Sequence, residues 1–172
     1  VQSHQRAIVA QRSSSFVSEI VPVPSANGER VAIDGGPRVD CSLEKLQKLK
    51  PAFESNGTVT AGNASTLSDG AAAVVVVSDE VRKSMRGQPA CRIVATAVHA
   101  RKPQDLFLAP VGAIEKLLRK TDRQVADIDL FEINEAFASQ TIACMRELRI
   151  SPESLNVNGG ALALGHPIGC SG

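Results

Sequence analysis

The chain has no tryptophan and no tyrosine, and five phenylalanines are its only large aromatic side chains. Proteins that bind single-stranded nucleic acids stack the bases on aromatic side chains, so this composition speaks against that class. The charges are balanced as well, with 19 basic and 18 acidic residues, and leave no basic surface of the kind that nucleic acids or anionic membranes require. We therefore expect neither a nucleic acid nor a membrane among the partners of this protein.

Hydrophobic runs are short in this chain. No apolar stretch approaches the length that crosses a bilayer, and the first residues, VQSHQRAIVAQ, contain neither the hydrophobic region nor the cleavage site of a signal peptide. They also contain no initiator methionine, and the chain stops three residues after a glycine-rich loop. We expect these residues to be part of a longer polypeptide.

The cysteines show no paired spacing. Cys41, Cys91, Cys144 and Cys170 lack the C-x-x-C pattern of metal and redox sites, so we predict free thiols and no bound metal. The first three are interpreted as small buried hydrophobic residues. Free thiols indicate a reducing compartment, for which we predict the cytoplasm, with the mitochondrial matrix and the peroxisome left open.

For the first third of the chain we predict a long excursion from the main fold that does not form a hydrophobic core of its own. Apolar spacing predicts a helix from about Gln2 to Phe16, and the prolines of the extended stretch that follows, Pro22 and Pro24, prevent its continuation. A turn-rich stretch over residues 31–40 precedes a short helix within SLEKLQKLKPAF, residues 42–53.

Residues 57–78 predict a loop, a short alanine-rich helix that begins near Asp69, and a strand from Ala73 to Ser78. Four consecutive valines, residues 74–77, favour a strand that is buried on both faces.

Beyond Gly87 the pattern alternates between strands and helices. Strands are predicted at 91–100, 127–133 and 155–160, and helices at 111–121 and 134–148, with Asn134 as the cap of the second helix. Another helix is predicted to begin after Gly169. This alternation is typical of a layered α/β fold.

One histidine, His166, lies in the glycine-rich stretch NVNGGALALGHPIGCSG, residues 156–172. Pro167 forces the residue before it out of the helical region, so the imidazole is held by a stiff main chain. The neighbouring glycines let another backbone or a ligand come close. His4 and His99 have no such context, and we interpret them as a surface residue and a strand-end residue.

Three segments carry the chemical signal together: GTVTAGNAS at 57–65, NEAF at 134–137 and NGGALALGHPIG at 158–169. In this order and spacing they resemble the thiolase family, the acyl-CoA C-acetyltransferases, over essentially the whole chain. The nearest resemblance is to its acetyl-CoA acetyltransferase and 3-ketoacyl-CoA thiolase branch. The resemblance implies transfer of an acyl group from a CoA thioester to a cysteine, and then to the α-carbon of a second acetyl-CoA or back to CoA.

The resemblance also implies roles for two residues. His166 matches the base that takes the proton of the nucleophilic thiol, because a thiol titrates above neutral pH and a neighbouring imidazole activates it. Its Nε2–H also helps to bind the thioester oxygen during condensation. Asn134 matches an asparagine that holds a water at the same oxygen, where negative charge develops.

Further positions match CoA and acyl contacts of the family, with CoA thioesters as substrates and no separate cofactor. Ser65 matches a serine that binds the pantetheine arm, and Ala61 lies beside it. Phe137 lines the pocket near the thioester. The remaining matches are Leu106 on the acyl side and Arg38, Leu49 and Phe53 near the nucleotide; Leu49 and Phe53 also read as helix-face core residues and Arg38 as a solvated charge.

The chain departs from the family pattern in two ways. Neither the nucleophilic cysteine nor the acid/base cysteine falls within these residues, and Cys170 matches a non-catalytic position, so we predict that the isolated chain is inactive. At 106–110, LFLAP replaces a methionine followed by a glycine-rich turn. The larger Phe107 and Leu108 would narrow or reshape the acyl channel.

By this resemblance the fold is an incomplete thiolase-like fold, layered α/β/α/β/α, with part of a loop domain. Residues 1–67 are predicted to be the remainder of the CoA-binding loop domain, 68–86 the last helix and strand of the first half, and 87–172 a truncated second half. We expect stability only within a longer chain or a homo-oligomer, a dimer or a tetramer. Two alternatives stay open: a longer-chain 3-ketoacyl-CoA thiolase, and a non-catalytic thiolase-like lipid carrier or scaffold.

Overall fold

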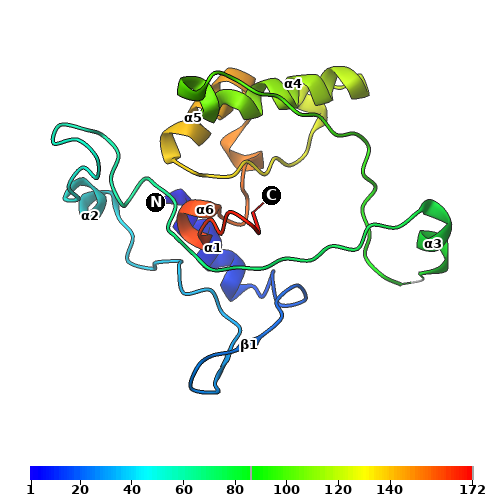
Figure 1. Ribbon diagram of the computed structural model, residues 1–172, viewed down its shortest axis with the longest axis horizontal. Helices are drawn as coiled ribbons and strands as arrows, with labels where there is room; N and C mark the ends of the chain where they lie inside the picture. The colour runs from blue at the N-terminus through cyan, green and yellow to red at the C-terminus, as the bar shows by residue number, and fades with distance from the viewer. Residues whose placement is uncertain (86, 172) are drawn as a thin grey trace.

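The structure is a computed structural model that describes residues 1–85 and 87–171. Helix α1 (Gln2–Arg12) packs against α6 (Ala161–Leu164), so segments from the beginning and the end of the chain lie together at the centre of the molecule (Figure 1). The helix predicted for 2–16 is therefore present, but it ends at Arg12. The buried side of α1 consists of small residues, Ser3, Ala7 and Ala10, which allow a close approach.

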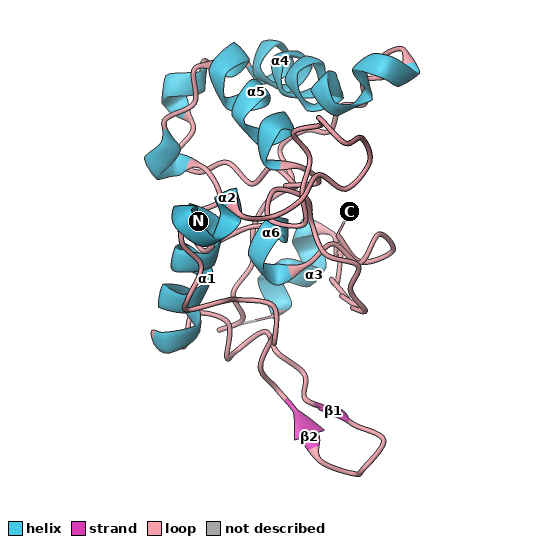
Figure 2. Cartoon of the chain, turned by 90° about the vertical axis from the view of Figure 1, so that its left-hand side faces the viewer, coloured by secondary structure: helices cyan, strands magenta, loops and turns pink. Residues whose placement is uncertain are grey.

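Residues 13–60 form an irregular region, as the sequence predicts. Two short strands, β1 (Val23–Pro24) and β2 (Arg30–Val31), pair antiparallel in a hairpin that projects from the body (Figure 2). Gly28, at φ +85°, occupies the left-handed position of the hairpin turn. The predicted short helix is α2 (Leu43–Gln47), which begins where the Ser42 hydroxyl accepts a hydrogen bond from the backbone N–H of Lys45.

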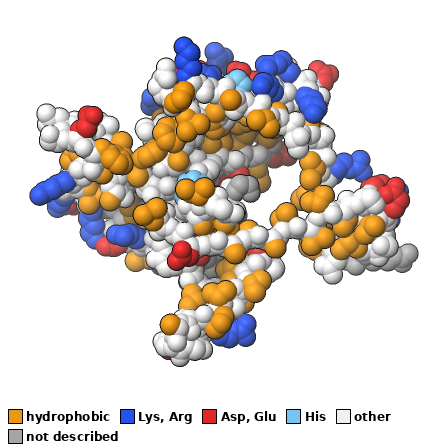
Figure 3. Space-filling model, in the orientation of Figure 1, with side chains coloured by type: hydrophobic (Ala, Val, Ile, Leu, Met, Phe, Trp, Pro, Cys, Tyr) orange, Lys and Arg blue, Asp and Glu red, His pale blue; other side chains and the backbone are white. Residues whose placement is uncertain are grey.

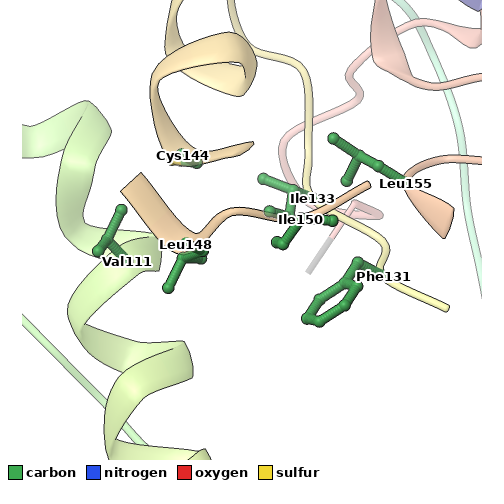
Figure 4. Packing of buried hydrophobic residues seen from close by; sticks show 7 residues of the cluster. All are labelled: Val111, Phe131, Ile133, Cys144, Leu148, Ile150 and Leu155. Carbon is green, nitrogen blue, oxygen red and sulfur yellow. The ribbon is translucent and has the colours of Figure 1, made fainter. Parts of the chain in front are cut away.

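The second half of the chain contains the main apolar core. Helix α4 (Ala109–Thr121) packs beside α5 (Ala138–Leu148), and the short helix η1 (Pro103–Leu108) contacts both. Two more short helical turns are η2 (Val125–Asp127) and η3 (Pro152–Ser154). The cluster shown in Figure 4 consists of Val111, Phe131, Ile133, Cys144, Leu148, Ile150 and Leu155. Each large aliphatic side chain buried in this way stabilises the fold by about 1.5–3 kcal/mol.

A short parallel pairing joins residues 131–133 to residues 154–156. The N–H of Phe131 donates to the carbonyl of Ser154, and the N–H of Asn156 donates to the carbonyl of Phe131, both at 2.8 Å. The buried amide of Asn156 then continues the ladder: its Oδ1 accepts from the N–H of Ile133 and its Nδ2 donates to the carbonyl of Ile133, again at 2.8 Å each. One side chain thus replaces a backbone neighbour.

Side chains alternate in burial along residues 131–135. Phe131, Ile133 and Glu135 are buried, whereas Glu132 and Asn134 are exposed. This is the geometry of a strand, although only the bridge at Phe131 satisfies the hydrogen-bond pattern in the strand predicted for 127–133. Asn134 is not the predicted helix cap, because α5 begins four residues later with Phe137 at the capping position.

The valine strand predicted for 73–78 is wrong for this chain. Residues 66–78 have no regular structure, and Val74, Val75 and Val76 are 87%, 83% and 73% exposed. The strand predicted for 91–100 is likewise unpaired, and no helix forms near Asp69; the helix of this region is α3 (Asp79–Ser84). A strand needs a neighbour for its backbone hydrogen bonds, and no described segment pairs with either stretch through its backbone. Figure 3 shows hydrophobic side chains on the surface of the arm that leads to α3.

The smaller predictions fare differently. Residues 168–170 form a turn, and the helix predicted to begin after Gly169 lies mostly outside the described residues. The strand predicted for 155–160 is reduced to the bridge at Leu155, and α6 was not predicted. Of the three cysteines expected to be buried, only Cys144 is; Cys91 is exposed and Cys41 is half-buried. No helix in the described part of the chain is long and apolar enough to cross a membrane.

The accessible surface is much larger than a folded monomer of this size requires. It measures 12889 Å², whereas a compact monomer of 18.1 kDa exposes about 8,100 Å². The excess includes the valines of residues 74–77, which line an open groove of about 1280 Å³ together with residues 88–93. This conformation therefore leaves apolar surface that needs a covering partner.

The isolated 172-residue chain is expected to elute from a size-exclusion column as an expanded or associating species. In urea it should unfold gradually, because the core around Phe131 is small relative to the uncovered surface. A compact monomer with one steep unfolding transition would contradict this prediction.

The Asn156→Ala substitution is expected to lower the free energy of unfolding by about 3 kcal/mol, because both backbone groups of Ile133 lose buried partners. Asn156→Gly is the matched variant: it also removes the amide but tolerates the φ of +48°, so it should be more stable than the alanine variant by about 1 kcal/mol. Urea unfolding of the complete protein measures both values. If the glycine variant were as stable as the wild type, the two hydrogen bonds of the Asn156 amide to Ile133 would not stabilise the fold.

Candidate active site

His166 and Asn134 meet although 32 residues separate them in the sequence. The Nδ2 atom of Asn134 lies 3.2 Å from Nε2 of His166, and which atom donates depends on the tautomer of the ring. With the ring proton on Nδ1, the amide N–H of Asn134 donates to Nε2, whose lone pair is then the basic atom. Asn134 is exposed and His166 is half-buried, so this pair faces an open side of the molecule.

The inner face of the imidazole is enclosed. Its Nδ1 atom is buried and has no hydrogen-bond partner among the described residues. An unpaired buried polar atom costs about 1–3 kcal/mol. Among the described residues, the ring therefore makes a side-chain hydrogen bond only at Nε2, to Asn134, while its Nδ1 side is packed against the protein.

The loop that carries His166 is packed against residues 66–70. The N–H of His166 donates to the carbonyl of Thr66 at 3.3 Å. Gly165 has φ +92°, and a Cβ there would lie 2.2 Å from the Ser68 hydroxyl oxygen; a Cβ at Gly70 would lie 2.6 Å from the ring of Pro167. Glycine is therefore required on both sides of this contact, as the glycine-rich sequence indicates.

The AGNAS and NEAF segments form a second contact through their backbones. The N–H of Ser65 donates to the carbonyl of Ala136 at 3.0 Å, and the N–H of Ala138 donates to the carbonyl of Asn63 at 2.8 Å. Ala64 and Phe137 form the antiparallel bridge between these bonds. The structure therefore brings all three motifs together: 61–66 contacts both 134–138 and the His166 loop.

Two predicted acyl-side residues lie near this junction. The ring of Phe137 packs edge to face against Phe107, with ring centroids 5.1 Å apart. Leu106 precedes Phe107 in η1 and is exposed. Because Phe107 is anchored on Phe137, the LFLAP segment is held next to the NEAF motif.

The predicted nucleotide-side residues lie around α2 and the turn after it. A Cβ at Gly62 would lie 2.7 Å from Leu49, so Leu49 packs beside Gly62, which follows the exposed turn residue Ala61. Phe53 is 78% exposed and is therefore not a core residue; it lines an open cavity of about 370 Å³ with residues 54 and 56–59. Arg38 lies apart from these two, with an exposed side chain and a backbone N–H that donates to Nδ1 of His4 at 3.2 Å.

Two buried polar residues near the site were not singled out from the sequence. Glu135 accepts hydrogen bonds from the hydroxyl of Ser3 at 2.7 Å and from the N–H of Leu162 at 3.2 Å. A signal for Glu135 exists: the alternation along FEINE places it on the same face as Phe131 and Ile133. No local pattern marks Ser3, because its partners lie more than 130 residues away.

Burial is the largest cause of the pKa shifts of three groups in this part of the molecule, Cys144, Glu132 and His4. It raises the pKa of the Cys144 thiol, which contacts the carbonyl of Phe107 at 3.6 Å. Burial, and then the nearby negative charge of Glu135, raise the pKa of Glu132. The pKa of His4 is lowered by burial first and then by the positive N-terminus and Arg38. In the part of the chain that the structure describes, no three histidine, cysteine or acidic residues form a metal-binding group.

Comparison with known proteins shows which family shares this fold and these motifs. The model of the thiolase N-terminal domain matches residues 1–80, and that of the thiolase C-terminal domain matches residues 87–172. A probable acetyl-CoA acyltransferase of Staphylococcus aureus is 48% identical over the whole chain, which covers 45% of that relative. The chain thus spans about half the length of the curated relatives it matches.

Solved structures agree. The acetyl-CoA acetyltransferase of Bacillus anthracis superposes with a TM-score of 0.93 at 44% identity, over 99% of this chain and 44% of that one. Human mitochondrial 3-ketoacyl-CoA thiolase in complex with CoA gives 0.94 at 43% identity, over 99% and 43%. The predicted thiolase-like α/β fold is therefore confirmed, since the chain superposes on these structures over 99% of its length although several of the predicted strands are absent. The chain belongs to the thiolase family. The boundaries predicted at residues 67 and 86 stay predictions.

The Cys144 thiol is expected to resist alkylation in the native protein, because burial raises its pKa and so lowers the thiolate fraction. Iodoacetamide at pH 8, followed by peptide mapping of the complete protein, should label Cys144 at least about tenfold more slowly than in urea. The half-buried Cys170 is the internal control and should react faster than Cys144. Equal native and unfolded rates for Cys144 would overturn this assignment.

Proposed function

We propose that this chain is the histidine-bearing and CoA-binding part of an acyl-CoA C-acetyltransferase, which condenses acetyl-CoA with an acyl-CoA reversibly through a cysteine thioester. The observation that carries the proposal is the contact of 3.2 Å between Asn134 and Nε2 of His166, on a loop whose His166 N–H donates to Thr66, the residue after AGNAS. The names of the similar proteins, acetyl-CoA acyltransferase and 3-ketoacyl-CoA thiolase, support the same reaction class.

In this proposal His166 is the base. Nε2 accepts the proton of a cysteine thiol, and the resulting thiolate attacks the carbonyl carbon of the acyl thioester. The C–S bond to CoA then breaks, and the leaving CoA sulfur takes the proton back from the imidazolium. The nucleophilic cysteine and the acid/base cysteine come from polypeptide outside these residues, so the isolated chain is inactive in acyl transfer.

Asn134 supports the condensation step. When the α-carbon of acetyl-CoA loses a proton, negative charge develops on the thioester oxygen. The Asn134 amide and the His166 Nε2–H lie close enough together to serve the same oxygen, Asn134 through a water as the family resemblance implies. A preorganised donor of this kind contributes about a hundredfold to a thousandfold in rate.

We assign the CoA contacts to residues that lie between the contact of the AGNAS and NEAF segments and the open cavity that Phe53 lines. Ser65 and Ala61 would contact the pantetheine arm, because their loop joins the site through the Ser65 N–H. Leu49 and Phe53 would contact the nucleotide, beside the cavity that Phe53 lines. Arg38 lies outside this cavity and is the weakest member of the set. A similar solved thiolase holds CoA, which supports CoA thioesters as substrates.

A 3-ketoacyl-CoA thiolase that degrades longer chains is the second candidate. The observation that favours it is the similarity to human mitochondrial 3-ketoacyl-CoA thiolase, whereas the packing of Phe107 on Phe137 would affect the length of acyl chain that fits. Comparing thiolysis rates of short and long 3-ketoacyl-CoA by the complete protein separates the two candidates. Activity with neither substrate would favour a lipid carrier or scaffold.

The apolar surface and the thiols bear on the proposed assembly and location. The uncovered apolar surface supports a homo-oligomer, a dimer or a tetramer, or association with the rest of the same polypeptide. Four cysteines without disulfides support a reducing compartment such as the cytoplasm.

In the complete protein, His166→Ala is expected to lower thiolysis and condensation by about a thousandfold or more, because both directions need the base. Asn134→Ala should slow condensation by about a hundredfold to a thousandfold and thiolysis by less. Initial rates in both directions measure these effects. His99→Ala is the matched control, since the His99 ring packs on Gly112 of α4. Near-normal turnover of His166→Ala would refute the assignment of the base.

A further inference from the structure

A buried carboxylate lies directly behind the catalytic pair. Glu135 is 8% exposed. Its Oε2 accepts hydrogen bonds from the Ser3 hydroxyl at 2.7 Å and from the N–H of Leu162 at 3.2 Å. The Ser3 oxygen in turn accepts from the N–H of Gly160 at 3.0 Å. A buried carboxylate is costly unless such donors surround it, so these contacts are needed for the fold to hold Glu135 there.

The chain closes tightly around this carboxylate. A Cβ at Gly160 would lie 2.5 Å from Oε2 of Glu135, and a Cβ at Gly159 would lie 2.7 Å from Cβ of Ala7. The Gly159 position, at φ +89°, therefore requires glycine, and a side chain at position 160 would displace the Glu135 carboxylate; α1 and α6 approach each other at this point. The glycine pair allows Glu135 to reach the N–H of Leu162 in the first turn of α6.

Two adjacent side chains of one segment, Asn134 and Glu135, contact the two ends of residues 162–166. Glu135 accepts a hydrogen bond from the N–H of Leu162 at the start of α6, and Asn134 contacts Nε2 of His166, two residues after α6 ends. Because burial alternates along the segment, Glu135 points inward and Asn134 points to the open side. A displacement of α6 relative to the segment would change the distance between Asn134 and His166.

We propose that Glu135 is a positioning residue that sets the geometry of the Asn134–His166 pair through α6. It touches neither the imidazole nor the site of acyl transfer, and it acts by hydrogen bonds to one oxygen. This inference rests on the proposed function for its effect on rate, but not for its effect on the ring itself. A misplacement of about 1 Å in a catalytic group can cost about a hundredfold in rate.

The experiment uses three substitutions in the complete protein. Glu135→Ala removes the accepting oxygen, and Glu135→Asp draws it back by the length of one methylene group. Both substitutions are expected to lower kcat per active site by about tenfold to a hundredfold. The KM for CoA should stay within about twofold, because the AGNAS loop is held by backbone atoms of residues 136 and 138. Glu135→Gln can place its single oxygen at the Oε2 position, keep both bonds and retain kcat within about threefold.

A second measurement does not depend on acyl transfer. Diethylpyrocarbonate modifies a free imidazole nitrogen, so the rate of His166 modification, followed by peptide mass spectrometry, reports whether Nε2 is covered by Asn134. This rate should rise severalfold in Glu135→Ala and remain unchanged in Glu135→Gln. Ser3→Ala removes only one donor and should give a smaller change in the same direction, which provides a test if Glu135→Ala does not fold. Glu147→Ala, at an exposed position of α5, is the matched control.

The outcomes separate the two ideas. An unchanged rate of His166 modification in Glu135→Ala, or in Ser3→Ala if the former does not fold, overturns the positioning role. Equal losses of kcat in the alanine and glutamine variants overturn it as well, since charge rather than the shared oxygen would then be required. If modification responds as expected while His166→Ala retains near-normal turnover, the positioning role stands and the proposed base is wrong.

Discussion

The structure depends on the alternation of side chains along residues 131–135. Phe131 and Ile133 enter the apolar core, and the same pleat turns Asn134 toward the open side. The backbone of this segment is paired on one side by Ser154 and Asn156, and its continuation is bridged to the AGNAS loop. Core, CoA loop and candidate catalytic pair therefore share one stretch of chain, and an error in its register would disturb all of them.

Buried hydrogen bonds, rather than apolar area, define the geometry on the site side of this stretch. The Asn156 amide replaces a neighbouring strand, and the Glu135 carboxylate binds the start of α6. A buried polar group has few alternative partners, so each of these contacts selects one arrangement of the backbone. The Gly165 position, at φ +92°, favours glycine, and a Cβ at Gly160 would displace the Glu135 carboxylate.

Part of the fold could be predicted from the sequence and part could not. Helices α1, α4 and α5 were predicted because their apolar spacing and end signals are local. The valine run at 74–77 was predicted as a buried strand, but its burial depends on a neighbouring strand, and no described segment pairs with it. Asn134 was read as a helix cap on local grounds, yet α5 begins at Ala138 and the amide is directed to a histidine far along the chain.

The sequence by itself indicated the family and the candidate residues through the resemblance of its three motifs, and the glycines and the proline around His166 restrict the backbone there wherever such residues occur. It did not determine which side chains meet. Tertiary structure decided that Asn134 reaches His166, that Glu135 bonds to Ser3 and Leu162, and that Phe53 lies on the surface. These contacts join segments up to 132 residues apart, and their formation depends on packing between elements that no local pattern encodes.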